Sequence, residues 1–137
     1  MTEYKKEILR TRHAGFTGWC GVVIDEAENG VCRAHCDLQP QHLNPRGVAH
    51  GGLLCTLMDV AAGTAAIFAS DPPRMMVTQS AEVHYLRPAA EGRLTAEAKV
   101  LKAGRSVAVV SVEVRDGAEK LVAAGTFEMF YLQEDLL

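Results

Sequence analysis

The chain has 137 residues, of which 48% are hydrophobic and 23% charged, which suits one globular domain and excludes a disordered or low-complexity protein. A net charge of -3 gives no basic field to hold a phosphate backbone, and aromatic residues, at 6%, offer few platforms for stacking bases, so no nucleic-acid partner is expected. The longest apolar stretch, residues 57–69, is interrupted by Asp59 and is too short to span a bilayer, so no membrane partner is expected. The N-terminal residues have no apolar core and no small-residue cleavage site, so they are not expected to be a secretory signal.

The first part of the chain predicts a helix and a hairpin. Residues 1–19 are expected to form a short charged helix followed by a loop. Two strands follow, over residues 20–26 and 31–38. The Asn29-Gly30 pair that joins them predicts a tight turn, because both turn positions adopt positive φ at little cost.

One long helix and four more strands are predicted after a polar loop. The helix covers residues 51–70 and is stopped by Asp71-Pro72-Pro73. Turn sequences bound the four strands, which lie near residues 75–86, 93–102, 105–115 and 121–131. We therefore expect one α+β domain over residues 1–137, in which a curved antiparallel sheet of about five to six strands wraps the long helix, with residues 1–19 as N-terminal helix and loop and residues 20–137 as core.

The four cysteines are expected to be buried free thiols. Cys32 and Cys36 lie in one predicted strand, where ~3.3 Å per residue puts their Cα atoms about 13 Å apart, too far for a disulfide. Neither the cysteines nor the five histidines show metal-ligand spacing, so no metal is expected. Free thiols favour a reducing cytoplasm.

The long helix predicts an oligomer. Its residues are small or apolar on nearly every side, so it must be covered all round to avoid a large exposed apolar patch. A sheet can wrap most of it, and a second copy of the chain is the simplest cover for the flank rich in Ala and Gly.

Gly51 and Gly52 are placed where this helix begins. The N–H groups of a first helical turn have no partner inside the helix, and at the positive end of the helix dipole they can hold a developing negative oxygen. Glycine lets a substrate carbonyl approach them closely. Alternatively, the two glycines only permit a tight entry into the helix.

Asp59 is the one acidic group in this apolar helix. A carboxylate there would be desolvated unless it is paired or kept wet, which is typical of functional groups. The alternative is a narrow polar stripe, formed with Thr56 and Gly63, that faces water. Because Gly51 and Asp59 are eight positions apart, they are separated by about 12 Å along the helix axis. If both act on one bond, they must come from different chains.

Other polar residues near this helix have plain structural interpretations. His50 lies beside the candidate anion site but histidines at helix entries often only bond to the backbone, and Asn44 before a proline can stabilise a turn. A set of turn residues could meet the phosphates of a nucleotide-like carrier, although solvated turn charges are the commoner reason for such residues; they are Arg87, Lys102, Arg105 and Ser106.

These residues together carry a family resemblance. The run Asn44…Gly47…His50-Gly51-Gly52, then Asp59, Thr78, Tyr85-Leu86-Arg87-Pro88 and Leu101-Lys102-Ala103-Gly104-Arg105 resembles the hotdog-fold acyl-CoA thioesterases of the phenylacetate-degradation type, over residues 15–132. The resemblance implies a hotdog fold, an acyl-CoA substrate with no separate cofactor, and dimers paired into tetramers.

The resemblance also implies roles for individual residues. Gly51, assisted by His50, would polarise the thioester carbonyl, and Asp59 of the partner subunit would act as general base or nucleophile. Asn44 would position the carbonyl or the attacking water. Substrate-binding positions would be Gly52, Thr78, Tyr85, Arg87, Lys102, Arg105 and Ser106. We expect the acyl group to enter a slot between subunits, lined by helix residues such as Leu54 and Met58.

The sequence therefore predicts an acyl-CoA thioesterase. The main alternative is a hotdog protein that binds acyl-CoA as a sensor or carrier, for which a poised carboxylate at Asp59 has no use. A hotdog hydratase or dehydratase ranks last, because His50 and Asp59 could meet only across subunits.

Overall fold

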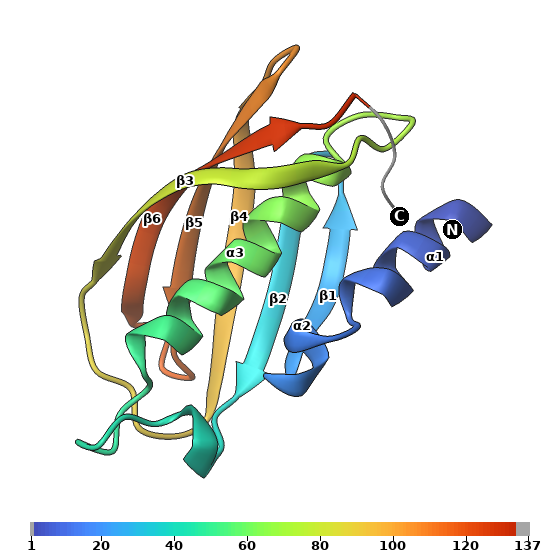
Figure 1. The fold of residues 1–137 in the computed structure, drawn as a ribbon. Helices are drawn as coiled ribbons and strands as arrows, with labels where there is room; N and C mark the ends of the chain where they lie inside the picture. The colour runs from blue at the N-terminus through green and yellow to red at the C-terminus, as the bar shows by residue number, and fades with distance from the viewer. Residues whose placement is uncertain (1, 134–137) are drawn as a thin grey trace.

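The computed structural model describes residues 2–133 (Figure 1). In chain order its helices are α1 (Glu3–Arg12), α2 (Phe16–Trp19), the 3-10 helix η1 (Pro40–His42) and α3 (Gly51–Ile67). Its strands are β1 (Val22–Glu28), β2 (Val31–Asp37), β3 (Met76–Tyr85), β4 (Arg93–Ala103), β5 (Val107–Arg115) and β6 (Leu121–Tyr131).

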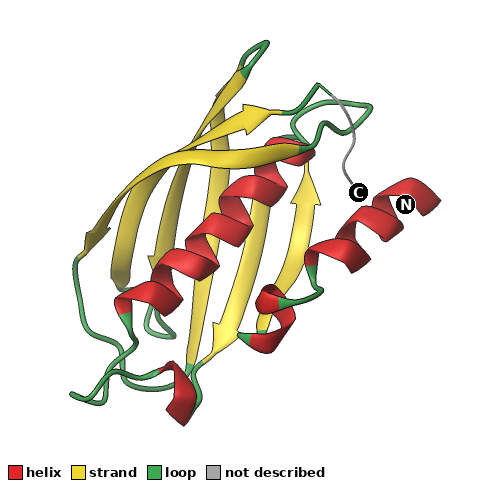
Figure 2. Cartoon of the chain, in the orientation of Figure 1, coloured by secondary structure: helices red, strands yellow, loops and turns green. Residues whose placement is uncertain are grey.

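The six strands form one antiparallel sheet in the order β1-β2-β4-β5-β6-β3. The sheet curves around α3, while α1 and α2 lie beside β1, at the edge of the sheet opposite β3 (Figures 1 and 2). This confirms the predicted α+β architecture of a long helix wrapped by a sheet.

Alternating side chains decide which face of the sheet meets the helix. Along β4, Leu94, Ala96 and Ala98 are buried, whereas Arg93 and Glu97 are exposed. β5 pairs on both sides, with β4 and with β6, which confirms that its two apolar faces mark an interior strand.

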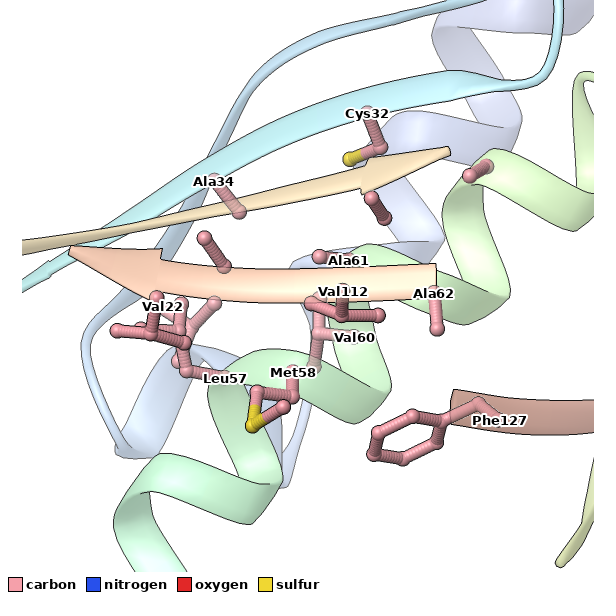
Figure 3. Close-up of a cluster of buried hydrophobic side chains, with 14 of the residues drawn as sticks. Val22, Cys32, Ala34, Leu57, Met58, Val60, Ala61, Ala62, Val112 and Phe127 are labelled. Atoms are coloured by element: carbon pink, nitrogen blue, oxygen red, sulfur yellow. The ribbon is translucent and has the colours of Figure 1, made fainter. Parts of the chain in front are cut away.

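The core lies between α3 and the sheet (Figure 3). Leu57, Met58 and Ala61 are fully buried on the helix, and they face small strand residues such as Ala34 and Ala96, which are also fully buried. Small residues let the helix and sheet backbones approach closely.

The N-terminal segment differs from the prediction. Residues 16–19 form one helical turn where a loop is predicted, closed by hydrogen bonds from Trp19 N to Gly15 O (2.9 Å) and from Cys20 N to Phe16 O (2.9 Å). Because Cys20 completes this turn, β1 begins at Val22, two residues later than predicted.

Two other segments also differ. The 3-10 helix η1 lies within the polar loop that is predicted before the long helix. The long helix ends at Ile67, before the prolines that were expected to stop it, because Phe68 leaves the helical conformation. The Phe68 carbonyl then accepts a hydrogen bond from Gly30 N (3.1 Å).

The predicted turn between β1 and β2 is confirmed, since Asn29 (φ 50°) and Gly30 (φ 76°) both have positive φ. The structure also has all four cysteines as free thiols. Cys20, Cys32 and Cys36 are buried and Cys55 is half-buried. Burial raises the pKa of Cys32 to about 12 and that of Cys36 to about 11, so both thiols stay protonated at neutral pH.

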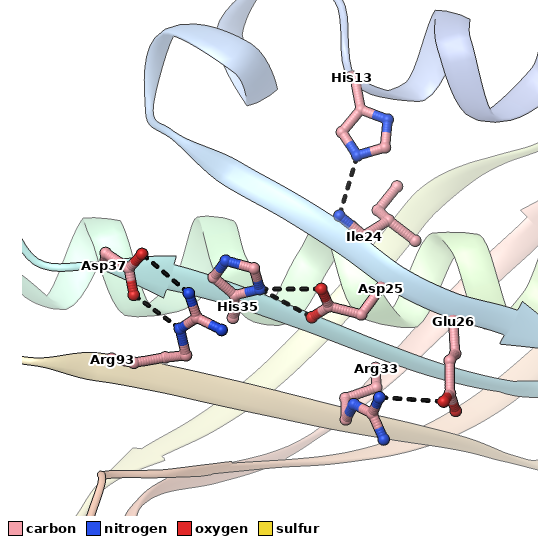
Figure 4. Close-up of polar contacts among 8 residues, drawn as sticks. All are labelled: His13, Ile24, Asp25, Glu26, Arg33, His35, Asp37 and Arg93. Atoms are coloured by element: carbon pink, nitrogen blue, oxygen red, sulfur yellow. Dashed lines mark hydrogen bonds and ion pairs between the residues drawn. The ribbon is translucent and has the colours of Figure 1, made fainter.

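Ion pairs connect side chains of the neighbouring strands β1, β2 and β4 (Figure 4). Arg93 bonds Asp37 through two nitrogens (2.8 and 3.1 Å), and this contact lowers the pKa of Asp37. Exposed pairs of this kind add little stability. Within residues 2–133, no helix is both long and apolar enough to cross a bilayer.

Candidate active site

His50 shapes the start of α3. It is the N-cap residue, and its Nδ1 accepts a hydrogen bond from Gly52 N (2.8 Å). Nδ1 is therefore unprotonated, and the ring proton lies on Nε2, which points away from this bond. The structural role considered for His50 is confirmed.

In the first turn of α3, the Gly52 N–H donates to His50 Nδ1, and the Leu53 and Leu54 N–H groups donate to His50 O. The Gly51 N–H, in contrast, has no acceptor among residues 2–133. This N–H lies at the positive end of a 17-residue helix. The geometry makes Gly51 a free donor for an oxygen that gains negative charge.

Tyr85 closes one side of this donor. A Cβ added at Gly51 would lie 3.3 Å from the Tyr85 ring, so the ring packs directly over the glycine. Tyr85 remains 54% exposed, and partial burial raises the pKa of its hydroxyl. The Tyr85 ring therefore borders the Gly51 N–H on one side, and its exposed part remains accessible to a second molecule.

Asp59 lies two turns further along α3 and is half-buried. Thr78 of β3 donates a hydrogen bond from Oγ1 to Asp59 Oδ1 (2.6 Å). Thr78 itself is exposed, so the bond lies at the surface between α3 and β3. The structure brings these two predicted site residues together, and it orients the carboxylate toward the β3 edge.

Arg12 is a charged neighbour of this region that the sequence did not single out. It reaches from α1 to α3, donating from Nη2 to Val60 O (3.1 Å) and from Nε to Thr64 Oγ1 (3.2 Å). Burial lowers the pKa of Arg12, and the negative charge of Asp59 partly offsets this effect. Arg12 and Asp59 therefore lie within electrostatic range of each other.

Arg12 also covers part of α3 within the protomer. A Cβ added at Gly63 would lie 2.8 Å from Arg12 Nη2 and 2.6 Å from Met76 Cε, so part of the flank expected to await a second copy is covered within the protomer. The part left accessible is nearer the helix N-terminus and consists of Gly51, Gly52, Cys55, Thr56 and Asp59.

The loop before α3 uses Asn44 as a turn residue. Its Oδ1 accepts hydrogen bonds from Arg46 N (2.9 Å) and Val48 N (3.3 Å). The turn-stabilising interpretation is confirmed. The side-chain NH₂ group has no partner among residues 2–133, so a contact of Asn44 with substrate stays a prediction.

The predicted carrier-binding residues fall into two places. Arg87 follows the C-terminal end of β3, whereas the other three lie at or near the β4–β5 hairpin, beside the N-terminal end of β3; they are Lys102, Arg105 and Ser106. β3 has ten residues, so the two places are about 30 Å apart. Within one protomer they do not form one site.

The predicted acyl-slot lining is wrong. Leu54 is 4% exposed and Met58 is fully buried, and Met58 packs near Gly125 of the sheet. These side chains belong to the core. An accessible pocket of about 360 Å³ lies instead between α2, η1 and the start of α3, and Phe16 and Trp19 line it.

Comparisons with known proteins show which family and which solved structures the chain resembles. A model described as the thioesterase superfamily matches residues 46–123. The chain is 28% identical to the medium/long-chain acyl-CoA thioesterase YigI of Salmonella typhimurium, covering 83% of each chain.

Two solved structures are also similar. One is a variant of the phenylacetic acid degradation protein PaaI from Thermus thermophilus, at 30% identity and a TM-score of 0.78, covering 85% of this chain and 98% of that one. The other is smu.793 from Streptococcus mutans bound to acetyl CoA, at 29% identity and a TM-score of 0.75, covering 80% of this chain and 86% of that one.

Proposed function

This chain belongs to the thioesterase superfamily, and we propose that it hydrolyses acyl-CoA thioesters to a free acid and coenzyme A at a site shared by two protomers. Its curated relative YigI is a medium/long-chain acyl-CoA thioesterase, and smu.793 binds acetyl CoA. The observation that carries the proposal is the placement of Asp59, held by Thr78 beside an open sheet edge.

The distance along α3 requires two protomers. Gly51 and Asp59 are eight residues apart on one straight helix, which separates them by about 12 Å. A carbonyl oxygen bound to the Gly51 N–H is therefore out of reach of Asp59 in the same chain. Asp59 of a second copy must supply the carboxylate.

β3 supplies the surface on which a second copy can dock. It is an edge strand of ten residues, paired with β6 on one side only, and most of its residues are exposed. A long unprotected edge is a ready template for pairing with another strand. Antiparallel pairing of two β3 strands sets two α3 helices side by side in opposite directions, so each Gly51 approaches the Asp59 region of the other.

The chemistry follows from this arrangement. The thioester carbonyl oxygen accepts from Gly51 N–H, which stabilises the charge that develops on it. Asp59 of the partner subunit removes a proton from water, the water oxygen bonds to the carbonyl carbon, and the C–S bond breaks to release the thiolate, which takes up a proton. Alternatively, an oxygen of the Asp59 carboxylate bonds to the carbonyl carbon and the C–S bond breaks to release the thiolate, which leaves an anhydride that water hydrolyses to the free acid and the Asp59 carboxylate.

The same dimer brings basic residues of the two protomers together. When two β3 strands run antiparallel, the C-terminal end of β3 in one protomer lies beside the N-terminal end of β3 in the other. Arg87 of the first protomer is then on the same side of the dimer as the β4–β5 hairpin of the second. The two groups that are far apart in one protomer then lie near each other across the interface. We propose that they bind the nucleotide end of coenzyme A from both subunits.

The test is a panel of acyl-CoA thioesters incubated with the purified protein. Free coenzyme A is measured by chromatography, because the half-buried Cys55 could react with a thiol reagent. We expect release of coenzyme A at a rate proportional to enzyme. Binding of acyl-CoA without release would support a sensor or carrier instead.

A further inference from the structure

Two large aromatic side chains are exposed on α2. Phe16 is 62% exposed and Trp19 is 79% exposed, although side chains of this size usually lose most of their exposure on folding. Their rings stack, with centroids 6.0 Å apart and an angle of 27° between planes. Two stacked, exposed rings form an apolar patch, and apolar patches on a protein surface indicate binding sites.

The pair borders the pocket next to the candidate carbonyl site. The pocket holds about 360 Å³, and its lining combines apolar side chains with residues that open α3; they include Phe16, Trp19, Leu43, Leu53, His50 and Gly52. Tyr85 stands on the β3 side of Gly51, whereas the pocket lies on the α2 side. A group attached to a carbonyl at Gly51 therefore has this pocket within reach.

Buried hydrogen bonds fix the pocket relative to Gly51. His42 is 6% exposed, and its Nε2 donates to Cys20 O (2.8 Å) at the end of α2. The carbonyl of His42 accepts from His50 N (2.9 Å), directly before the helix. His42 therefore connects the end of α2, which carries Phe16 and Trp19, to the start of α3.

Gly18 lets α2, which carries Phe16 and Trp19, pack against the end of α1. A Cβ at this position would collide with the carbonyl oxygen of His13, so only glycine lets α2 pack this closely on the end of α1. The aromatic pair thus sits on a rigid turn rather than on a free loop, which is the arrangement that a selective pocket needs.

We propose that this pocket receives the apolar part of the acyl group and that Phe16 and Trp19 determine acyl specificity. The inference rests on the proposed thioesterase function. A volume of about 360 Å³ lies near the lower end of ligand pockets, so it has room for the apolar part of a medium-length acyl chain, whereas the methyl group of an acetyl thioester occupies little of it. The enzyme therefore favours medium acyl chains over acetyl.

Trp19 allows a direct binding test because it is the only tryptophan in the chain. The probe is octyl-CoA, a thioether that cannot be hydrolysed. It is titrated into the purified protein while tryptophan emission is recorded, with coenzyme A alone as reference. We expect a saturable change with octyl-CoA that exceeds any change with coenzyme A. Equal responses to the two would overturn the inference, whether or not the protein is an enzyme.

The kinetic test compares Trp19→Ala and Phe16→Ala with Val31→Ala, which removes another exposed apolar side chain at the far end of the β1–β2 hairpin. We expect the ratio of kcat/KM for octanoyl-CoA to that for acetyl-CoA to fall about tenfold or more in the aromatic variants and to stay unchanged in Val31→Ala. A parallel loss on both thioesters, or a changed oligomeric state of Trp19→Ala by light scattering, would show that the pair has another role. Absence of hydrolysis in the unmodified protein would reject the proposed function, and the fluorescence titration would still decide the pocket.

Discussion

Replacing Asp59 with asparagine is expected to lower kcat/KM for acyl-CoA hydrolysis by about 100- to 10,000-fold, the range that removal of a positioned general base produces. The amide has the shape of the carboxylate and still accepts the hydrogen bond from Thr78, so the fold and the oligomer should be retained. The amide can neither take a proton from water nor attack a carbonyl carbon. Steady-state kinetics on a medium-chain acyl-CoA measure the loss.

The matched control for this change is Glu97→Gln, which also neutralises a carboxylate but does so on an exposed position of β4. We expect its kinetics to equal those of the unmodified protein. Circular dichroism and light scattering of both variants verify that fold and assembly are unchanged. Substantial activity in Asp59→Asn would remove this carboxylate from the mechanism under either chemical route.

Replacing Gly51 with valine is expected to lower kcat by about 100- to 1,000-fold, the cost of losing one donor to an oxyanion. The new Cβ would lie 3.3 Å from the Tyr85 ring, and the two methyl groups would cover the N–H that the thioester oxygen must reach. Valine at the first helical position keeps the backbone hydrogen bonds of α3, so stability should change much less than activity.

The control for Gly51→Val is Gly117→Val, in the turn between β5 and β6, where no atom lies within 4 Å of an added Cβ. Thermal unfolding should be similar for the two variants and only Gly51→Val should lose turnover. If Gly51→Val retains full kcat, the carbonyl oxygen is bound by another donor.

The strands and the long helix could be predicted because their signals are local. Alternation along β4 and the Asn29-Gly30 turn specify strands whatever the rest of the chain does. Helix α2 gave no such signal, since a single turn has no periodicity and is closed by contacts that involve Gly15 and Cys20. Its prediction as a loop was wrong for that reason.

The candidate site could be predicted only in part. Asp59 and Gly51 stand out in the sequence because their chemistry is unusual within an apolar helix. The error for Leu54 and Met58 has a different origin: in a helix that is apolar all round, the sequence does not indicate which face meets the sheet. Arg12 and Trp19 come from the N-terminal segment, and only tertiary packing brings them near α3.

Each reaction centre requires residues of two protomers, and complementation tests this requirement most directly. Asp59→Asn and Gly51→Val proteins are mixed in equal amounts, exchanged through mild denaturation and refolding, and assayed for acyl-CoA hydrolysis. Half of the random dimers then carry one site with an intact Gly51 and an intact Asp59, so activity should return to about a quarter of that of the unmodified protein. A mixture that exchanges subunits and yet stays as inactive as its two parents would contradict a shared site.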